Sequence, residues 1–124
     1  MNQDHSRSSS LLSGRWRITE MDAWDAEAID LVQPGYIQFS GDRQGEFGFI
    51  VVRGWMDCRP FQRDGQAGVE FSWAGDDDGD EAGGRGWAVL FDDETLQGHI
   101  FFHMGMDSAF VAKPYGDAGG EEWQ

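Results

Sequence analysis

Short segments in which apolar and polar residues alternate dominate the chain, and turn-forming residues separate them. Glycine recurs at intervals of roughly ten residues, between segments rich in tryptophan, phenylalanine, valine and isoleucine. Alternation with a period of two is typical of strands that bury one face. The pattern therefore predicts consecutive strands joined by tight turns.

The candidate turns can be checked by the faces that they bring together, because a slip of one residue reverses every side chain. A two-residue turn at 64–65 pairs Cys58 with Phe71 on an apolar face and Arg59 with Glu70, as an ion pair, on a polar face. With a first strand over 14–20, the chain forms eight strands in an antiparallel meander. The other turns are centred on residue 43 or lie at 53–54, 76–81, 93–94 and 105–106.

Eight sequential strands with one apolar face each are best satisfied by closing the sheet, since closure removes the edge strands. We therefore predict an all-β fold, an eight-stranded antiparallel up-and-down barrel, with an open sandwich of two sheets as the alternative. Its many rings predict a largely filled interior, with at most a modest apolar cavity toward one mouth. The residues expected to face inward are Trp16, Ile18, Ile37, Phe39, Phe47, Phe49, Val51, Met56, Cys58, Val69, Phe71, Trp73, Trp87, Val89, Phe91, Ile100, Phe102 and Val111.

A helical pattern is visible only at 22–32, after the first strand. There Asp22 could cap a short helix. Its apolar contacts would be Trp24, Ile29 and Val32. An irregular loop explains the same residues equally well. No domain boundary interrupts the chain, so residues 13–114 are predicted to form one barrel domain between two polar, flexible tails, 1–12 and 115–124.

The first strand opens with Gly14-x-Trp16, and this pair at the start of an eight-strand meander resembles the signature of the calycin superfamily, the lipocalins and their relatives. The resemblance implies a calycin-like barrel in which the tryptophan closes one end and a basic residue of the last strand lies across its ring. Here that residue is Lys113, in a cation–π contact on Trp16 that contributes about 0.5–2 kcal/mol. Resemblance of fold does not by itself establish function.

The charge balance limits the classes of partner. The 124 residues include 23 acidic and 9 basic side chains, for a formal net charge of −14. Nucleic acid is not an expected partner, because phosphate binding needs clustered lysine and arginine. No membrane span and no secretory signal is expected from the apolar runs. Because Cys58 is the sole cysteine, no intrachain disulfide is possible and a cytoplasmic location is expected.

None of the chemistry-bearing residues predicts a catalytic or metal site. The acidic run at 76–81 lacks the glycine and glutamate positions of an EF-hand loop and is interpreted as a solvated hairpin tip. His99 and His103 lie about 13 Å apart along one strand, too far to share a metal. Cys58 is expected inside, with a raised thiol pKa and no base beside it. We therefore expect neither enzymatic activity nor a cofactor.

Two functions remain. In the first, a small hydrophobic ligand enters the barrel at a mouth lined by Trp16, Trp73, Trp87 and Phe102. In the second, the protein is an interaction module for a protein partner, or forms a homodimer, through its acidic surface or an outer apolar patch. That patch is predicted to consist of Ile50, Val52 and Trp55. The alternative is that the segment after the first strand covers it.

Overall fold

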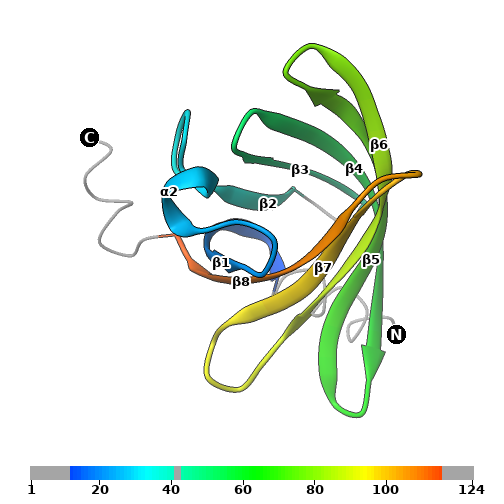
Figure 1. Cartoon of the computed structure of the whole chain (residues 1–124). Helices are drawn as coiled ribbons and strands as arrows, with labels where there is room; N and C mark the ends of the chain where they lie inside the picture. Colours follow the sequence, from blue (N-terminus) through cyan, green and yellow to red (C-terminus); the bar gives the residue numbers. More distant parts are fainter. Residues whose placement is uncertain (1–11, 41–42, 116–124) are drawn as a thin grey trace.

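The computed structural model describes residues 12–40 and 43–115. In this part of the chain eight antiparallel strands follow one another in sequence order and close into a barrel, as predicted (Figure 1). One short helix, α2 (Ala26–Ile29), follows the first strand. The strands are β1 (Gly14–Met21), β2 (Tyr36–Ser40), β3 (Gln44–Phe49), β4 (Val52–Arg63), β5 (Gln66–Asp77), β6 (Asp80–Leu90), β7 (Leu96–Phe102) and β8 (Asp107–Pro114).

The polar tails predicted at 1–12 and 115–124 fall almost wholly outside the described residues. The strands begin at Gly14 and end at Pro114, within the predicted barrel domain. Among the helices described, none has the length and apolar character needed to cross a membrane.

Strand β5 is paired along most of its length with both of its neighbours, β4 and β6. Its hairpin with β4 turns at Asp64 and Gly65, as predicted, and Cys58 lies opposite Phe71. Its hairpin with β6 turns at Asp78 and Gly79 within the acidic run, and both of these residues have a positive φ. The two hairpins extend past the rest of the barrel in opposite directions (Figure 1). The sheet formed by β4, β5 and β6 is therefore long, and its outer face is broad.

Many glycines lie inside strands, directly opposite an aromatic ring on the neighbouring strand. The sequence pattern places glycine mainly in turns, and for these positions that interpretation is wrong. In five of the pairs, a Cβ on the glycine would lie 2.4–2.9 Å from a ring carbon of its partner. Glycine is thus required where a ring lies flat across the next strand. The aromatic–glycine pairs are Tyr36–Gly48, Phe39–Gly45, Phe47–Gly54, Phe61–Gly68, Phe71–Gly86 and Phe110–Gly98.

Strand β6 presents the opposite face from the one predicted. The connection to β7 is not a two-residue turn at 93–94, because Leu90 pairs with Leu96 and five residues lie between them. This change of one residue turns Ala88 inward, where it is fully buried. It turns Trp87 and Phe91 outward, with 40% and 38% of their surface exposed.

The register between β7 and β8 also differs from the predicted one, because their connection is not a two-residue turn at 105–106. The predicted turn at 105–106 pairs Ile100 with Val111, whereas the structure pairs Ile100 with Ser108. Phe110 and Ala112 consequently face the core, and Val111 is only half-buried.

The registers of β3 with β2 and with β4 also differ from the prediction, but β2, β3 and β4 still turn the predicted faces toward the core. Ile37 pairs with Phe47 rather than Phe49, a shift of two residues that leaves both strands facing the same way. The β3–β4 turn lies at 50–51 rather than 53–54, so Val51 is in the turn instead of the core.

The segment after β1 combines the two structures that its sequence allows. It contains a single helical turn, and the N-cap is Asp25, whose carboxylate accepts a hydrogen bond from the Ala28 backbone N–H at 2.9 Å. Asp22, the predicted cap, instead accepts bonds from the Ser108 hydroxyl and the Ala109 N–H of β8. These bonds lower the pKa of Asp22, the Ser108 bond most strongly. They tie the segment to the barrel.

The expected apolar contacts of this segment are formed in part. The Trp24 ring lies 5.4 Å from the Phe49 ring, and Ile29 is almost fully buried. The Ile29 carbonyl accepts a 2.8 Å bond from the Ile50 N–H, which joins the segment to the β3–β4 turn. Val32, the third expected contact, is 66% exposed. The segment therefore covers one end of the barrel through Trp24 and Ile29 alone.

Candidate functional site

Aromatic rings in mutual contact occupy the barrel beneath the segment after β1. The Phe47 ring lies 5.0 Å from Trp73 and 5.7 Å from Phe49, and Phe102 lies 5.1 Å from Trp73. Phe47 and Phe49 are essentially fully buried, and Phe102 is half-buried against the core. Trp24 and Phe102 both lie against the Phe49 ring at this end, with ring centroids 5.4 and 6.4 Å from it.

The four residues predicted to line a ligand mouth do not come together. Trp16 is buried and its indole N–H donates to the Leu12 carbonyl at 2.9 Å. Trp73 is also buried, and its indole N–H donates to the Phe101 carbonyl at 3.2 Å. Trp87 lies on the outside of the barrel, so only Trp73 and Phe102 are in contact.

The closing contact between Trp16 and Lys113 is not formed. Lys113 is exposed and lies opposite Arg17 on the outer face, because the register of β8 differs from the predicted one. The cation–π contacts within the described part of the chain involve Arg15, Arg53 and Arg63.

The predicted apolar patch is not a single surface either. Val52 faces the core and is 4% exposed, and half-buried Ile50 lies in the β3–β4 turn against the segment after β1. Trp55 alone is exposed on the outer face, with the Arg53 guanidinium 5.4 Å from its ring centre. The apolar surface offered there to a partner is one tryptophan.

A large groove lies on the outer face of strands β4 to β7, and we call it the outer groove. Its volume is about 1020 Å³. Its lining includes three of the eight arginines of this acidic chain together with two outward-facing rings. The charged and aromatic side chains of its lining include Arg59, Arg63, Glu70, Arg85, Trp87 and Phe101.

Two cross-strand rows form the centre of the outer groove. In one row Arg85 on β6 lies between Ser72 on β5 and Phe101 on β7. In the next row Trp87 lies between Glu70 and His99. The Phe101 ring is stacked on the His99 ring at 4.5 Å, and His99 is bonded to Asp107. The aromatic wall of the groove is therefore held in place from β7 and β8.

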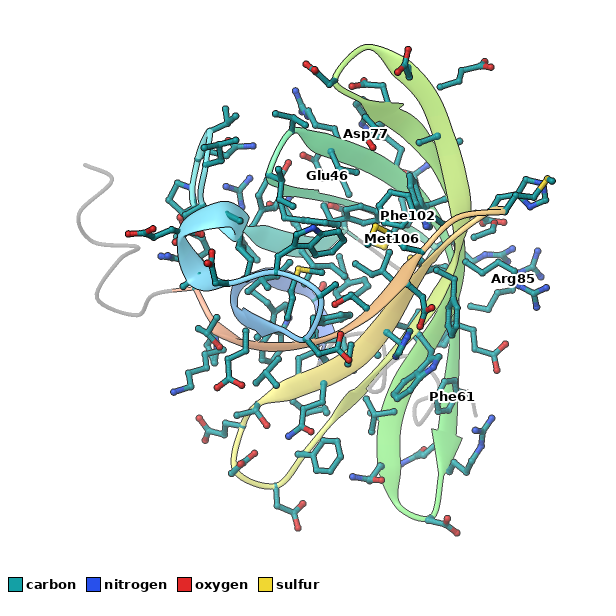
Figure 2. All side chains as sticks on the ribbon, in the orientation of Figure 1. Glu46, Phe61, Asp77, Arg85, Phe102 and Met106 are labelled. Atoms are coloured by element: carbon teal, nitrogen blue, oxygen red, sulfur yellow. The ribbon has the colours of Figure 1, made fainter. Side chains whose placement is uncertain are left out.

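The arginines of the groove differ in their partners. Arg59 pairs with Asp57 at 3.7 Å and Arg63 with Glu70 at 3.8 Å. Arg59 lies opposite Glu70 as the register predicts, but their expected ion pair is replaced by these two. Arg85 makes no ion pair and no side-chain hydrogen bond within residues 12–40 and 43–115, and it points away from the barrel (Figure 2). It is therefore a cation available to a ligand.

Sequence reasoning missed this site because it turned Trp87 inward. The available signal was the small size of Gly86 and Ala88, which alternate with Trp87 and fit a crowded interior better. The Phe71 ring occupies the space above Gly86, so a larger inward residue has no room there.

Metal ligands do not gather in the described part of the chain. No group of three or more histidine, cysteine or carboxylate side chains is placed to hold an ion there. His99 and His103 lie outward on β7 and beyond its end, and His99 bonds Asp107 instead.

Cys58 is 2% exposed, and burial, with a smaller contribution from Asp57, raises the pKa of its thiol from 9.0 to about 12. In the unfolded chain the thiol ionises first as the pH rises, while the folded protein keeps it protonated. Above the pKa of the thiol in the unfolded chain, ionisation therefore favours the unfolded state. We expect stability to fall by up to about 1.4 kcal/mol per pH unit in this range.

The measurement is urea unfolding of the wild type and of Cys58→Ala across the alkaline range. Above the pKa of the unfolded thiol, the stability of the wild type should fall more steeply with pH than that of Cys58→Ala, so the gap between the two curves should narrow. Parallel curves would show that the Cys58 thiol is not protected by burial.

A scan against protein-family models, a search of curated proteins and a search of solved structures each found no match to this chain.

Proposed function

We propose that this chain is a non-enzymatic binding protein that recognises its ligand in the outer groove. The observation that carries the proposal is Arg85, a cation without a partner among the described residues, beside two exposed rings in a groove of about 1020 Å³. An unpaired guanidinium forms bidentate bonds to a carboxylate, and adjacent rings bury an apolar group. The groove thus suits a ligand that has both.

The barrel interior is the competing location, for a small hydrophobic ligand. The half-buried residues Trp24, Ile50, Ala82, Leu90 and Phe102 pack against the core. Their incomplete burial supports entry of an apolar molecule there. Against this, the rings of Phe47, Phe49 and Trp73 already contact one another beneath them. A ligand in the outer groove displaces none of these core rings, and we therefore propose that the binding site lies there.

Two further predictions from the sequence, a calycin-like fold and a cytoplasmic location, belong to this proposal. A calycin-like classification is supported by Gly14-x-Trp16 together with the closed eight-stranded barrel. A cytoplasmic location is supported by the single cysteine, Cys58. A protein partner is compatible with both.

The test is a titration with 3-phenylpropionate, followed by nuclear magnetic resonance of the labelled protein. We expect the Arg85 Nε–H and Trp87 indole N–H signals to shift, with a dissociation constant of the order of 1 mM. Arg85→Gln should weaken binding by up to roughly fivefold, because an exposed ion pair contributes up to about 1 kcal/mol. The uncharged amide, 3-phenylpropionamide, should bind the wild-type protein more weakly than 3-phenylpropionate by the same factor.

Trp55→Ala is the matched control for Trp87→Ala, because both tryptophans lie exposed on the outer face. Only the Trp87 variant should lose binding. Shifts at Trp24 and Phe102 in place of Arg85 and Trp87 would move the site to the barrel mouth. The absence of saturable shifts at either place would exclude both locations for ligands of this class.

A further inference from the structure

We propose that the natural occupant of the outer groove is an extended peptide segment of a partner protein, with a carboxylate residue and an aromatic residue two positions apart. This inference rests on the proposed function, since it specifies the ligand of the same groove.

The spacing follows from strand geometry. Arg85 and Trp87 project from the same face of β6 and are separated by two residues, a distance of roughly 6.6 Å along the strand. In an extended peptide, side chains at positions i and i+2 share a face and repeat the same spacing. A carboxylate at i and a ring at i+2 can therefore meet Arg85 and Trp87 together, whereas neighbours at i and i+1 point to opposite sides.

The two rings of the groove favour an aromatic side chain at the second position. Trp87 and Phe101 are 40% and 41% exposed, whereas eight other rings among the described residues are buried. Phe101 lies directly across from Arg85 on β7, one row from Trp87. A ring placed on Trp87 therefore has Phe101 within the neighbouring row, and aromatic pairs add about 0.5–1.5 kcal/mol beyond the area that they bury.

The charges around Arg85 limit the ligand to a small number of carboxylates. The groove has three arginines, but Asp57 and Glu70 lie within it and already engage two of them. The whole chain has a net charge of −14, which repels a run of negative charge. A single carboxylate next to a ring is favoured, and a polyphosphate such as nucleic acid is not.

The exposure of the groove favours a peptide over an enclosed small molecule. Pockets for small ligands have volumes of about 300–1000 Å³ and enclose most of the ligand surface. In the outer groove Arg85, Trp87 and Phe101 all remain exposed, so a ligand that binds there is not enclosed by the protein. It can thus take several consecutive residues of a chain that continues beyond it at both ends.

Three synthetic peptides test the inference. The first is Ac-Ser-Gly-Glu-Gly-Phe-Gly-Ser-NH2; the second has Gln in place of Glu; the third has Glu and Phe adjacent, as Ac-Ser-Gly-Glu-Phe-Gly-Gly-Ser-NH2. We expect the first to bind the whole chain more tightly than either of the others, by up to roughly fivefold, since each of these loses one contact. Arg85→Gln should remove the difference between the first and second peptides, and Trp55→Ala should leave it unchanged.

The outcomes separate this inference from the proposed function. Equal binding of all three peptides, with shifts at Trp87, would overturn the spacing while leaving a ligand site in the groove. If neither the peptides nor 3-phenylpropionate shift Arg85 and Trp87, the groove itself is excluded as the site. Tighter binding of an eight-nucleotide thymidylate strand than of the first peptide would overturn the assignment of a peptide ligand.

Discussion

Replacement of Phe47 by alanine is expected to lower the free energy of unfolding by about 3–5 kcal/mol, the largest effect that we predict for a single side chain. Phe47 is completely buried, and its ring lies 5.0 Å from Trp73 and 5.7 Å from Phe49. Its loss removes apolar surface from the core and leaves a cavity that the paired strands cannot close. Urea unfolding, followed by tryptophan fluorescence, measures the change.

The partner glycine provides a specific control. A Cβ on Gly54 would lie 2.5 Å from the Phe47 ring, so Gly54→Val alone should be destabilising. In the double variant Phe47→Ala/Gly54→Val, the valine methyl groups enter the space that the ring has left. The double variant should therefore be more stable than Phe47→Ala alone. If the two destabilisations simply add, the ring does not occupy the space above Gly54.

Substitution of Gly98 by alanine is expected to destabilise the protein by about 2 kcal/mol, although alanine is ordinarily the better strand residue. The added Cβ would lie 2.0 Å from the Trp87 carbonyl oxygen and 2.9 Å from the Ala88 Cα. Overpacking of this kind costs about 1–3 kcal/mol, whereas the lower backbone entropy of alanine returns about 0.5–1 kcal/mol. The clash outweighs the entropic gain because backbone atoms cannot rotate away.

Gly83→Ala is the matched control on the adjacent strand. Its Cβ would approach the Trp73 carbonyl oxygen only to 3.0 Å, with the next atom at 3.7 Å, so its effect should be within about 1 kcal/mol of zero. A smaller residue at Phe110 should not rescue Gly98→Ala, because the Trp87 carbonyl remains in place. Wild-type stability of Gly98→Ala in urea unfolding would contradict the close approach of β6 and β7.

The part of the fold that the sequence predicts best is the β4–β5 hairpin. Its turn residues, Asp64 and Gly65, are adjacent in the chain and set the register of both strands. Alternating apolar residues on either side then agree with that register without further information. The closed barrel follows in the same way, because each strand has one apolar face to bury and closure buries all of them.

The prediction is wrong where the turn lacks a distinctive two-residue signal. The connection at 91–95 is stabilised by the Asp93 carboxylate, which accepts bonds from the Thr95 hydroxyl and N–H. These bonds lower the pKa of Asp93. A loop one residue longer or shorter reverses the faces of β6, and Trp87 is apolar enough to suit an inward position. The candidate site was missed through this single ambiguity.

The sequence by itself determined the number and order of the strands, their closure into an antiparallel barrel and the burial of Cys58. These features follow from alternation and turn residues, which are local properties of the chain. Only the tertiary structure decided that Trp87 and Phe91 remain outside and that Phe110 fills the core. That choice depends on the space left by side chains distant in the chain, as where the Phe71 ring occupies the position above Gly86. The same packing leaves Trp87 outside beside Arg85, and so forms the outer groove.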